Sequence, residues 1–340
     1  MKILLIMDPG LPVPPSLYGG IERIVFMLAN EYTRLGHELT LLAGPGSYCN
    51  GTTITFGINK AERSSVQKSK EILFVWNYLW RNRNKFDLVH NFGRLIYLLP
   101  ILNHPVKKIM SYQRRISPNA IQRVKQFPNR NLTFTACSTN CIDKSNVTGE
   151  WETVYNCVDF RSYTLNRAVT HNAPLIFLGR LDRIKGAHAA IAVAKKTNNK
   201  LLIGGNIPET QDNYAYYKKE IEPLIDNEQV IFLGALDDVQ KNTYLGQAKA
   251  LLFPIEWDEP FGIVMIEAMA CGTPVIAFNR GAVSEVVEEG LTGNKVNNVE
   301  EMSEAVYNIE KIDRDNCRKQ AQQRFNIDKI ASDYLRYTYD

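Results

Sequence analysis

Short apolar runs of strand length alternate with amphipathic helical stretches along almost the whole chain of 340 residues. This alternation is typical of βαβ units that build a parallel sheet. The first half holds strand-like runs such as KILLIM, ELTLLA and DLVH, and the second half holds PLIFLG, KLLIGG and ALLFP. Between the two series, residues 160–173 lack either periodicity and contain few strongly apolar residues. We therefore expect an α/β chain with two Rossmann-like, doubly wound parallel-sheet domains that face each other across a cleft.

The expected domain bounds are residues 1–165 and 166–315, followed by a helical end over 316–340. A composition of 45% hydrophobic and 22% charged residues is sufficient for two substantial cores, and it excludes disordered, collagenous and small disulfide-stapled chains. The first 165 residues hold 20 Lys and Arg against 11 Asp and Glu, whereas the remainder holds 20 against 25. This asymmetry predicts different ligands for the two halves, the first an anion or an anionic surface, although ordinary solvated charges explain it equally well.

The chain has no apolar stretch near the roughly 18–20 residues that a membrane span needs. Its apolar start is too short for a secretory signal, and its six cysteines are scattered without CxxC pairs. We therefore expect a cytoplasmic protein with reduced thiols.

The densest group of candidate residues lies in FPIEWDEPFGIVMIEAMACGTPVIAF, residues 253–278, where Gly262 follows an acidic turn and opens a helix. The unsatisfied N–H groups and the dipole of a helix start form a natural seat for a phosphate. Glu259 and Glu267 flank this seat and are suited to accept hydrogen bonds from sugar and ribose hydroxyls. The alternative is that Glu259 only complements the helix dipole and that Glu267 is a solvated helix residue. Glu267 lies among Ile, Ala and Met, however, where a carboxylate must be paired.

Two further strings join a strand to a helix. GRLDRIKG, residues 179–186, carries Arg180 and Lys185, which would form an electrostatic clamp for a diphosphate at the end of the strand. YGGIE, residues 18–22, carries Gly19 and Gly20, which allow close approach of the backbone to a ligand. The alternatives are surface basic residues and an ordinary turn.

Read together, these strings resemble the retaining family 4 glycosyltransferases of the GT-B fold over nearly the whole chain. The most specific string is EPFGIVMIEAMACGTPVIAFNRGAVSEVV, in which Glu259 and Glu267 stand eight residues apart. RLGHELTLLA, DLVHNFG and VYNCVD add weaker support. The chain length and the short first domain look most like the subgroup that includes a glycosyltransferase of antibiotic oligosaccharide assembly.

The resemblance implies a role for each matching residue on the side of the nucleotide-sugar donor. Arg180 and Lys185 would hold the diphosphate, Glu267 the ribose hydroxyls, and Glu259 the hydroxyls of the transferred sugar. Arg180, Lys185 and Glu259 are therefore the candidate catalytic residues. The remaining donor-side candidates are Gly19, Gly20, Ala235, Leu236, Phe261, Gly262, Ile263 and Val264, with the nucleobase near Ala235 and Leu236.

On the acceptor side, the candidates are His90, Gln113 and Arg114. Gln113 stands where members of the family usually carry a histidine beside the reacting sugar, and an amide cannot titrate. The resemblance also implies that the C-terminal helix crosses back to the N-terminal domain. Basic residues of that domain would meet a glycan, lipid-linked or small-molecule acceptor, with peripheral membrane contact, unless they are merely solvated. These residues are Lys107, Lys108, Arg114, Arg115, Arg123 and Lys125.

We predict a retaining glycosyltransferase that moves a sugar from a nucleoside diphosphate donor, most often UDP in this family, to an acceptor hydroxyl. A sugar-nucleotide epimerase and a catalytically impaired binding protein are the alternatives. No cofactor or metal is expected, because the cations of Arg180 and Lys185 replace one, and the Asp313-x-Asp315 string is read as a helix cap. No nucleic-acid-binding module is recognisable.

Overall fold

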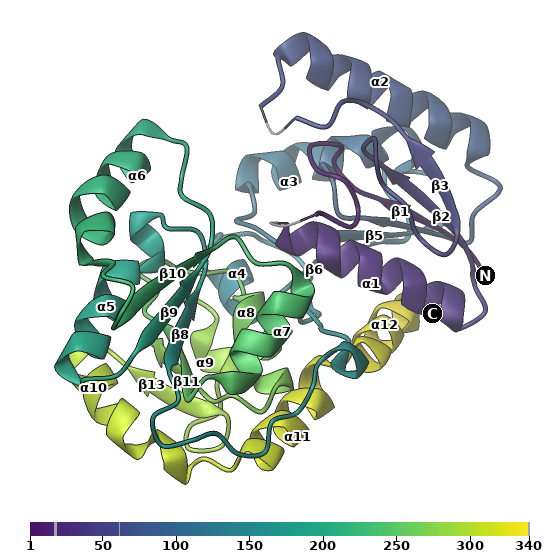
Figure 1. The fold of residues 1–340 in the computed structure, drawn as a ribbon. Helices are drawn as coiled ribbons and strands as arrows, with labels where there is room; N and C mark the ends of the chain where they lie inside the picture. Colours follow the sequence, from purple (N-terminus) through teal and green to yellow (C-terminus); the bar gives the residue numbers. More distant parts are fainter. Residues whose placement is uncertain (17–18, 61, 339–340) are drawn as a thin grey trace. The chain divides into compact units, whose positions relative to one another are not determined.

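The computed structural model describes residues 1–16, 19–60 and 62–338, and the chain divides into two compact units. Unit 1 consists of residues 1–156 together with the end of the chain from residue 327, and unit 2 consists of residues 157–326. Each unit contains one parallel sheet with helices packed against it (Figure 1). The predicted pair of Rossmann-like α/β domains is confirmed.

The sheet of unit 1 has seven parallel strands in the order β3-β2-β1-β4-β5-β6-β7. The inner strand β1 is apolar and buried after its first residue, Lys2, and Leu4 of this strand pairs with Thr40 on one side and Val89 on the other. Strands buried on both faces show continuous apolar runs of this kind. The strands are β1 (Lys2–Ile6), β2 (Glu38–Ala43), β3 (Thr52–Thr55), β4 (Leu88–Asn91), β5 (Lys107–Tyr112), β6 (Leu132–Ala136) and β7 (Glu152–Thr153).

The helices of unit 1 follow from amphipathic patterns and local caps. The first buries Ile24, Val25, Leu28 and Tyr32 along one side, and the second begins at a capping box formed by Ser64 and Gln67. These helices are α1 (Gly20–Arg34), α2 (Ser65–Asn82), α3 (Pro118–Lys125), α4 (Thr139–Asp143) and α12 (Ile327–Leu335), with 3₁₀ turns η1 (Leu95–Ile101) and η7 (Arg336–Thr338).

The sheet of unit 2 has six parallel strands in the order β10-β9-β8-β11-β12-β13. The strand order reverses between β8 and β11, which is the point where doubly wound sheets bind ligands outside the carboxyl ends of their strands. The strands are β8 (Leu175–Leu178), β9 (Leu201–Gly204), β10 (Val230–Gly234), β11 (Ala250–Phe253), β12 (Val275–Phe278) and β13 (Gly293–Val296).

Unit 2 also contains most of the helices in the second half of the chain. They are α5 (Ala187–Lys196), α6 (Gln211–Tyr216), α7 (Asp238–Gln247), α8 (Ile263–Ala270), α9 (Val283–Val286), α10 (Val299–Asn308) and α11 (Arg314–Phe325). Short turns complete the unit: η2 (Phe160–Ser162), η3 (Arg183–Lys185), the π turn η4 (Tyr217–Ile221), η5 (Glu222–Leu224) and η6 (Ile309–Lys311).

The boundary after the first series of strands lies at residues 156 and 157 rather than at 165 and 166. Residues 157–165, which include the first part of the segment 160–173 expected to be irregular, contain only the short turn η2 and are held to unit 2 by hydrogen bonds. Val158 N–H donates to the carbonyl of Phe325, and the Arg318 guanidinium donates to the carbonyls of Phe160 and Tyr163. The expected linker is therefore part of the second unit.

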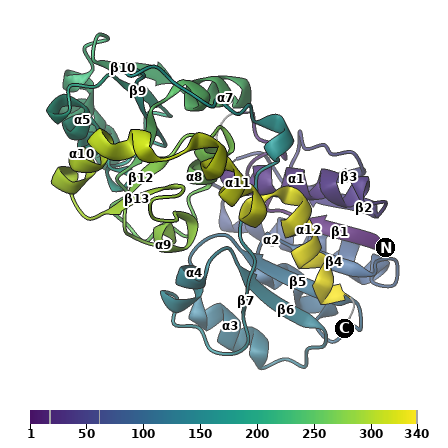
Figure 2. The same cartoon turned by 90° about the horizontal axis from the view of Figure 1, so that it is seen from below.

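The helical end of the chain is divided at Asn326, so the segment that returns to unit 1 begins at residue 327 rather than at 316. The first piece, α11, packs against α8 within unit 2, and Asp313 caps its start by accepting from Asn316 N–H at 2.7 Å, as predicted. The second piece, α12, lies beside α1 in unit 1 (Figure 2), where Asp328 and Arg34 form an ion pair of 3.4 Å.

Within the described residues, no helix is long and apolar enough to span a membrane. In the same part of the chain, no group of three or more His, Cys, Asp or Glu side chains is arranged to hold a metal ion.

Candidate functional site

Apart from Gly19 and Gly20, the predicted donor-side residues lie in unit 2, in helix α8 or in loops that follow the carboxyl ends of its strands. Arg180 follows β8 and pairs with Asp182 at 2.6 Å, and Lys185 ends the turn η3. The next residue, Gly186, has a φ of +77°, and a Cβ built there would lie 2.0 Å from the carbonyl oxygen of Pro254. This close approach requires glycine, and it holds the loop of Lys185 against the loop that follows β11.

The structure brings Lys185 and Glu259 into direct contact, although 74 residues separate them in the sequence. Lys185 Nζ donates to Glu259 Oε2 at 2.6 Å, and each side chain is only 15% exposed. Trp257 Nε1 donates to the same oxygen at 2.6 Å, and Lys185 Nζ lies 5.4 Å from the centre of the Trp257 ring. Glu259 Oε1 accepts no hydrogen bond from the described residues, so one oxygen of this carboxylate is available to a ligand.

The start of α8 provides the predicted amide donors. Gly262 is the N-cap of the helix and has a φ of +83°. A Cβ at this position would clash with the side chains of Phe253 and Met265. The N–H groups of Gly262, Ile263 and Val264 donate to no acceptor among the described residues. Free N–H groups at the positive end of a helix dipole favour an anion. The preceding Phe261 is buried and packs edge-on against the Phe325 ring, which fixes the entry into the helix.

Glu267 is buried within α8 and is paired, as its apolar sequence neighbours predicted. Lys241 Nζ donates to Glu267 Oε1 at 2.5 Å, and Tyr163 OH donates to the same oxygen at 3.0 Å. Burial, together with the adjacent Glu267 carboxylate, raises the pKa of Tyr163. Oε2 of Glu267 accepts from none of the described residues, so this carboxylate also keeps one oxygen for a ligand.

Lys241 and Tyr163 were not identified from the sequence. Lys241 belongs to α7 and Tyr163 to the irregular segment after residue 157, and neither lies in a recognisable motif. The only available signal was indirect: a glutamate in an apolar helix requires a cationic or hydroxyl partner from elsewhere in the fold.

Ala235 and Leu236 follow β10, at the same edge of the sheet as Arg180. Ala235 is exposed, whereas Leu236 is buried and lies close to Gly204, where a Cβ would approach Leu236 Cδ1 within 2.7 Å. This placement puts the exposed Ala235 next to the buried apolar side chain of Leu236.

The two candidate glycines of YGGIE lie in unit 1, at the start of α1, while Tyr18 of the same string lies outside the described residues. Gly19 is buried and has a φ of +150°, and a Cβ there would lie 2.7 Å from Pro15 Cβ and 2.9 Å from Glu22 Oε2. Burial raises the pKa of Glu22. Gly20 is the first residue of the helix.

His90 is placed in the core of unit 1, with no exposed surface. Its Nε2 lies 2.8 Å from Ser111 Oγ, its Nδ1 lies 3.3 Å from Tyr32 OH, and its ring packs against Phe92 and Tyr334. Burial lowers the pKa of His90 to about 3, so the ring is neutral. This environment does not support contact with an acceptor and explains His90 as a packed core residue.

Gln113 and Arg114 follow the carboxyl end of β5. Both polar atoms of the Gln113 amide are buried and have no hydrogen-bond partner, whereas Arg114 is exposed. A buried amide without partners costs free energy that a hydroxyl-bearing ligand would offset.

A network of ion pairs in unit 1 was also missed by the sequence analysis. Arg63 pairs with Asp8 at 2.5 Å and with Glu71 at 2.9 Å, and Arg94 pairs with the same two carboxylates at 3.0 and 3.2 Å. Asp8 and Arg94 follow the carboxyl ends of β1 and β4. The four residues of this network come from four segments with no shared motif, so their pairing could not be predicted from the sequence.

Part of the sequence matches a known protein family. Residues 167–324, nearly all of unit 2, match the family described as Glycosyl transferases group 1. A phosphatidyl-myo-inositol mannosyltransferase of Propionibacterium freudenreichii is 25% identical over 335 residues, covering 85% of this chain and 82% of that protein. An N-acetyl-alpha-D-glucosaminyl L-malate synthase of Bacillus anthracis is 28% identical over 56% of this chain and 53% of its own length.

Solved structures share the architecture of the whole chain. AviGT4, a glycosyltransferase involved in avilamycin A biosynthesis, superposes with a TM-score of 0.75 at 21% identity, covering 99% of this chain and 96% of its own. Alr3699/HepE of Anabaena, in complex with UDP and glucose, gives 0.74 at 19% identity, covering 99% and 98%. The chain has the GT-B glycosyltransferase fold. The match to the glycosyl transferases of group 1 covers residues 167–324.

Proposed function

We propose that this protein transfers a sugar from a nucleoside diphosphate donor to an acceptor hydroxyl with retention at the anomeric carbon. One observation carries the proposal: Lys185 and Glu259, from two separate sequence motifs, meet at 2.6 Å within unit 2, which also contains the free N–H groups of α8. A cation, helix amides and carboxylate oxygens are the groups needed to bind a diphosphate that carries a sugar.

In the proposed donor complex, Arg180, Lys185 and the N–H groups of Gly262, Ile263 and Val264 bind the diphosphate. Glu267 accepts from the ribose hydroxyls through Oε2, and Glu259 accepts from the sugar hydroxyls through Oε1. The base lies against the loop of Ala235 and Leu236. UDP is the favoured nucleotide, and the Anabaena protein, whose structure holds UDP and glucose, supports that choice.

The reaction breaks the bond between the anomeric carbon and the phosphate oxygen, so negative charge accumulates on the departing diphosphate. Donors that are already in place stabilise this charge, and removal of one such group typically lowers the rate by about 10²–10³-fold. The acceptor oxygen then bonds to the same face of the anomeric carbon, and its proton passes to an oxygen of the leaving phosphate. The cations of Arg180 and Lys185 supply the charge that a metal ion would otherwise provide.

We assign acceptor recognition to unit 1, with Gln113 as the group that hydrogen-bonds an acceptor hydroxyl. The similarity to a phosphatidyl-myo-inositol mannosyltransferase supports a lipid-linked acceptor among the glycan, lipid and small-molecule classes. The proposal includes a peripheral contact of the basic first half of the chain with an anionic membrane surface on the cytoplasmic side.

The test measures nucleoside diphosphate release from a panel of sugar nucleotides by the wild type, Arg180→Ala and Lys185→Ala. Lys195→Ala, an exposed lysine of α5, is the matched control. We expect each of the two site variants to lose at least tenfold in rate, while the control keeps the wild-type rate. Loss of less than tenfold in both site variants would contradict the assignment.

The same assay separates the alternatives. An epimerase would convert the donor alone into an isomeric sugar nucleotide, and a binding protein would bind UDP without releasing it from a sugar nucleotide. The anomeric configuration of the product, read by NMR, tests retention.

A further inference from the structure

The outward face of α2 carries a stripe of exposed apolar side chains. Val66, Leu73 and Trp80 recur every seven residues, so they lie along one side of the helix. Their exposed fractions are 64%, 61% and 56%, which is high for three large apolar side chains on one line. The opposite side of the helix buries Val75 and Leu79 and is accounted for by packing within unit 1.

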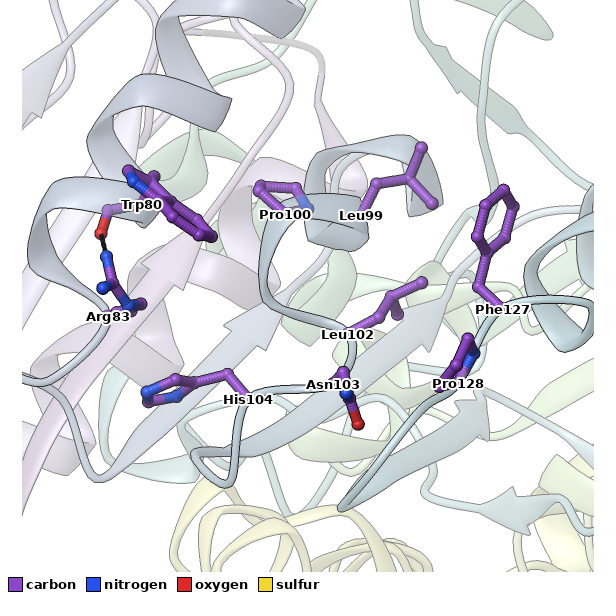
Figure 3. Close-up of a pocket in the computed structure, with 9 residues that line it drawn as sticks. All are labelled: Trp80, Arg83, Leu99, Pro100, Leu102, Asn103, His104, Phe127 and Pro128. Atoms are coloured by element: carbon purple, nitrogen blue, oxygen red, sulfur yellow. Dashed lines mark hydrogen bonds between the residues drawn. The ribbon is translucent and has the colours of Figure 1, made fainter.

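The stripe ends at a pocket of about 410 Å³ that Trp80 also lines (Figure 3). Leu99, Leu102 and Phe127 contribute apolar surface, and Phe127 is itself 53% exposed. The lining residues precede β4, β5 and β6, so the pocket lies at the amino edge of the sheet, opposite the edge that carries Gln113. The pocket is therefore separate from the proposed acceptor site.

The surroundings of the stripe are strongly basic. Residues 63–87, which contain α2, hold six Lys and Arg against two acids, Glu71 and Asp87. Glu71 is buried between Arg63 and Arg94, and Asp87 accepts from the backbone N–H of Lys2. The exposed cations of α2 and the loop after it are Lys68, Lys70, Arg81 and Lys85.

Arg83 is a basic residue that also lines the pocket. Its guanidinium stacks 4.2 Å from the centre of the Trp80 ring and donates to the Trp80 carbonyl at 2.5 Å. This stacking holds a positive charge in the lining of the pocket. An anionic group with an adjoining apolar chain matches that arrangement.

We propose that the α2 stripe and the adjoining pocket dock this protein onto the surface of an anionic lipid bilayer. The inference rests on the membrane contact in the proposed function and names the surface that makes it. A helix that lies in the interface of a membrane typically has apolar residues along one side, a Trp at its end and flanking Lys and Arg. Because a second copy would bring one cationic surface against another, charge complementarity favours lipid over self-association.

The test measures binding of the full chain to phosphatidylcholine vesicles with and without about one third phosphatidylglycerol, by co-sedimentation. One variant carries Val66→Ser, Leu73→Ser and Trp80→Ser, and its control carries Val239→Ser and Tyr307→Ser, two exposed apolar residues on helices of unit 2. A second variant carries Lys70→Gln, Arg81→Gln and Lys85→Gln, and its control carries Lys195→Gln and Lys219→Gln.

We expect salt-sensitive binding that requires phosphatidylglycerol, with at least tenfold loss in both α2 variants and none in the controls. Equal binding to both kinds of vesicle, no binding, or wild-type binding by the α2 variants would overturn the proposal. A concentration-dependent dimer that the apolar variant abolishes would also overturn it, since the stripe would then contact a second copy. Nucleoside diphosphate release is measured on the same preparations, so failure of docking is distinguished from failure of the transferase assignment.

Discussion

Replacing Lys185 with methionine removes the cation from the pair with Glu259 while keeping most of the side-chain volume. At the observed 2.6 Å, the attraction between the two charges is roughly 6 kcal/mol for an effective dielectric constant of about 20. Most of this is offset by the desolvation of two groups that are each only 15% exposed. In the variant, the Glu259 carboxylate keeps Trp257 as its donor but loses its counter-ion.

We therefore expect Lys185→Met to lose about 1–3 kcal/mol of folding stability. For a unit of this size, that loss corresponds to a fall in melting temperature of about 2–4 °C for each kcal/mol. The double variant Lys185→Met with Glu259→Gln removes both charges, and calorimetry should show that it regains most of the lost melting temperature.

Nucleotide binding should respond differently from stability. Because Lys185 is proposed to contact the diphosphate, titration calorimetry should show that UDP binds at least tenfold more weakly to both the single and the double variant. If the double variant regained UDP affinity as well as stability, the proposed contact of Lys185 with the diphosphate would be refuted. Lys185 would then have a purely structural role.

Three further predictions concern stability and ligand binding. His90 has a folded pKa of about 3 against an ordinary value near 6.5, so the unfolded chain binds a proton between these pH values that the folded chain does not. The unfolding free energy of the wild type should fall by up to about 1.4 kcal/mol for each pH unit below 6.5, and that of His90→Gln should fall less. Urea unfolding from pH 6.5 to 4.5 measures both, and an equal fall in the two proteins would contradict this prediction. Gly186→Ala should destabilise more than Gly234→Ala, because both glycines have a φ above +70° but only Gly186 faces the Pro254 carbonyl; equal unfolding free energies would rule out the clash. Glu267→Gln should raise the Kd for UDP at least tenfold with little effect on the Kd for inorganic pyrophosphate, and an equal rise for both would exclude ribose recognition.

The fold was predictable because both sheets contain apolar inner strands, such as β1 and β8, and these strands are separated by amphipathic helices in the sequence. KILLIM became β1, PLIFLG became β8, and the glycine at 262 opened a helix as expected. The division of the C-terminal helical segment at Asn326 was harder to predict from the sequence, since residues on both sides of Asn326 are compatible with a helix. Its position depends on contacts of α11 with α8 and of α12 with α1, which are distant in the sequence.

The residues of the candidate site were predictable only where they belong to recognisable sequence motifs. Arg180, Lys185, Glu259 and Glu267 stand in strings of recognisable spacing, whereas Tyr163 reaches Glu267 from 104 residues away without a motif. His90 shows the opposite error, because a histidine at the end of a strand gives no indication of whether its ring points into the core. In this protein, the ring is buried between Phe92 and Tyr334.

A titration of UDP, UMP and uridine into the wild type and Arg180→Ala tests the diphosphate assignment most directly. We predict that the wild type binds UDP at least a hundredfold more tightly than uridine, and that Arg180→Ala loses at least tenfold of this preference. Equal affinity of the wild type for the three ligands, or an unchanged preference in Arg180→Ala, would contradict the account.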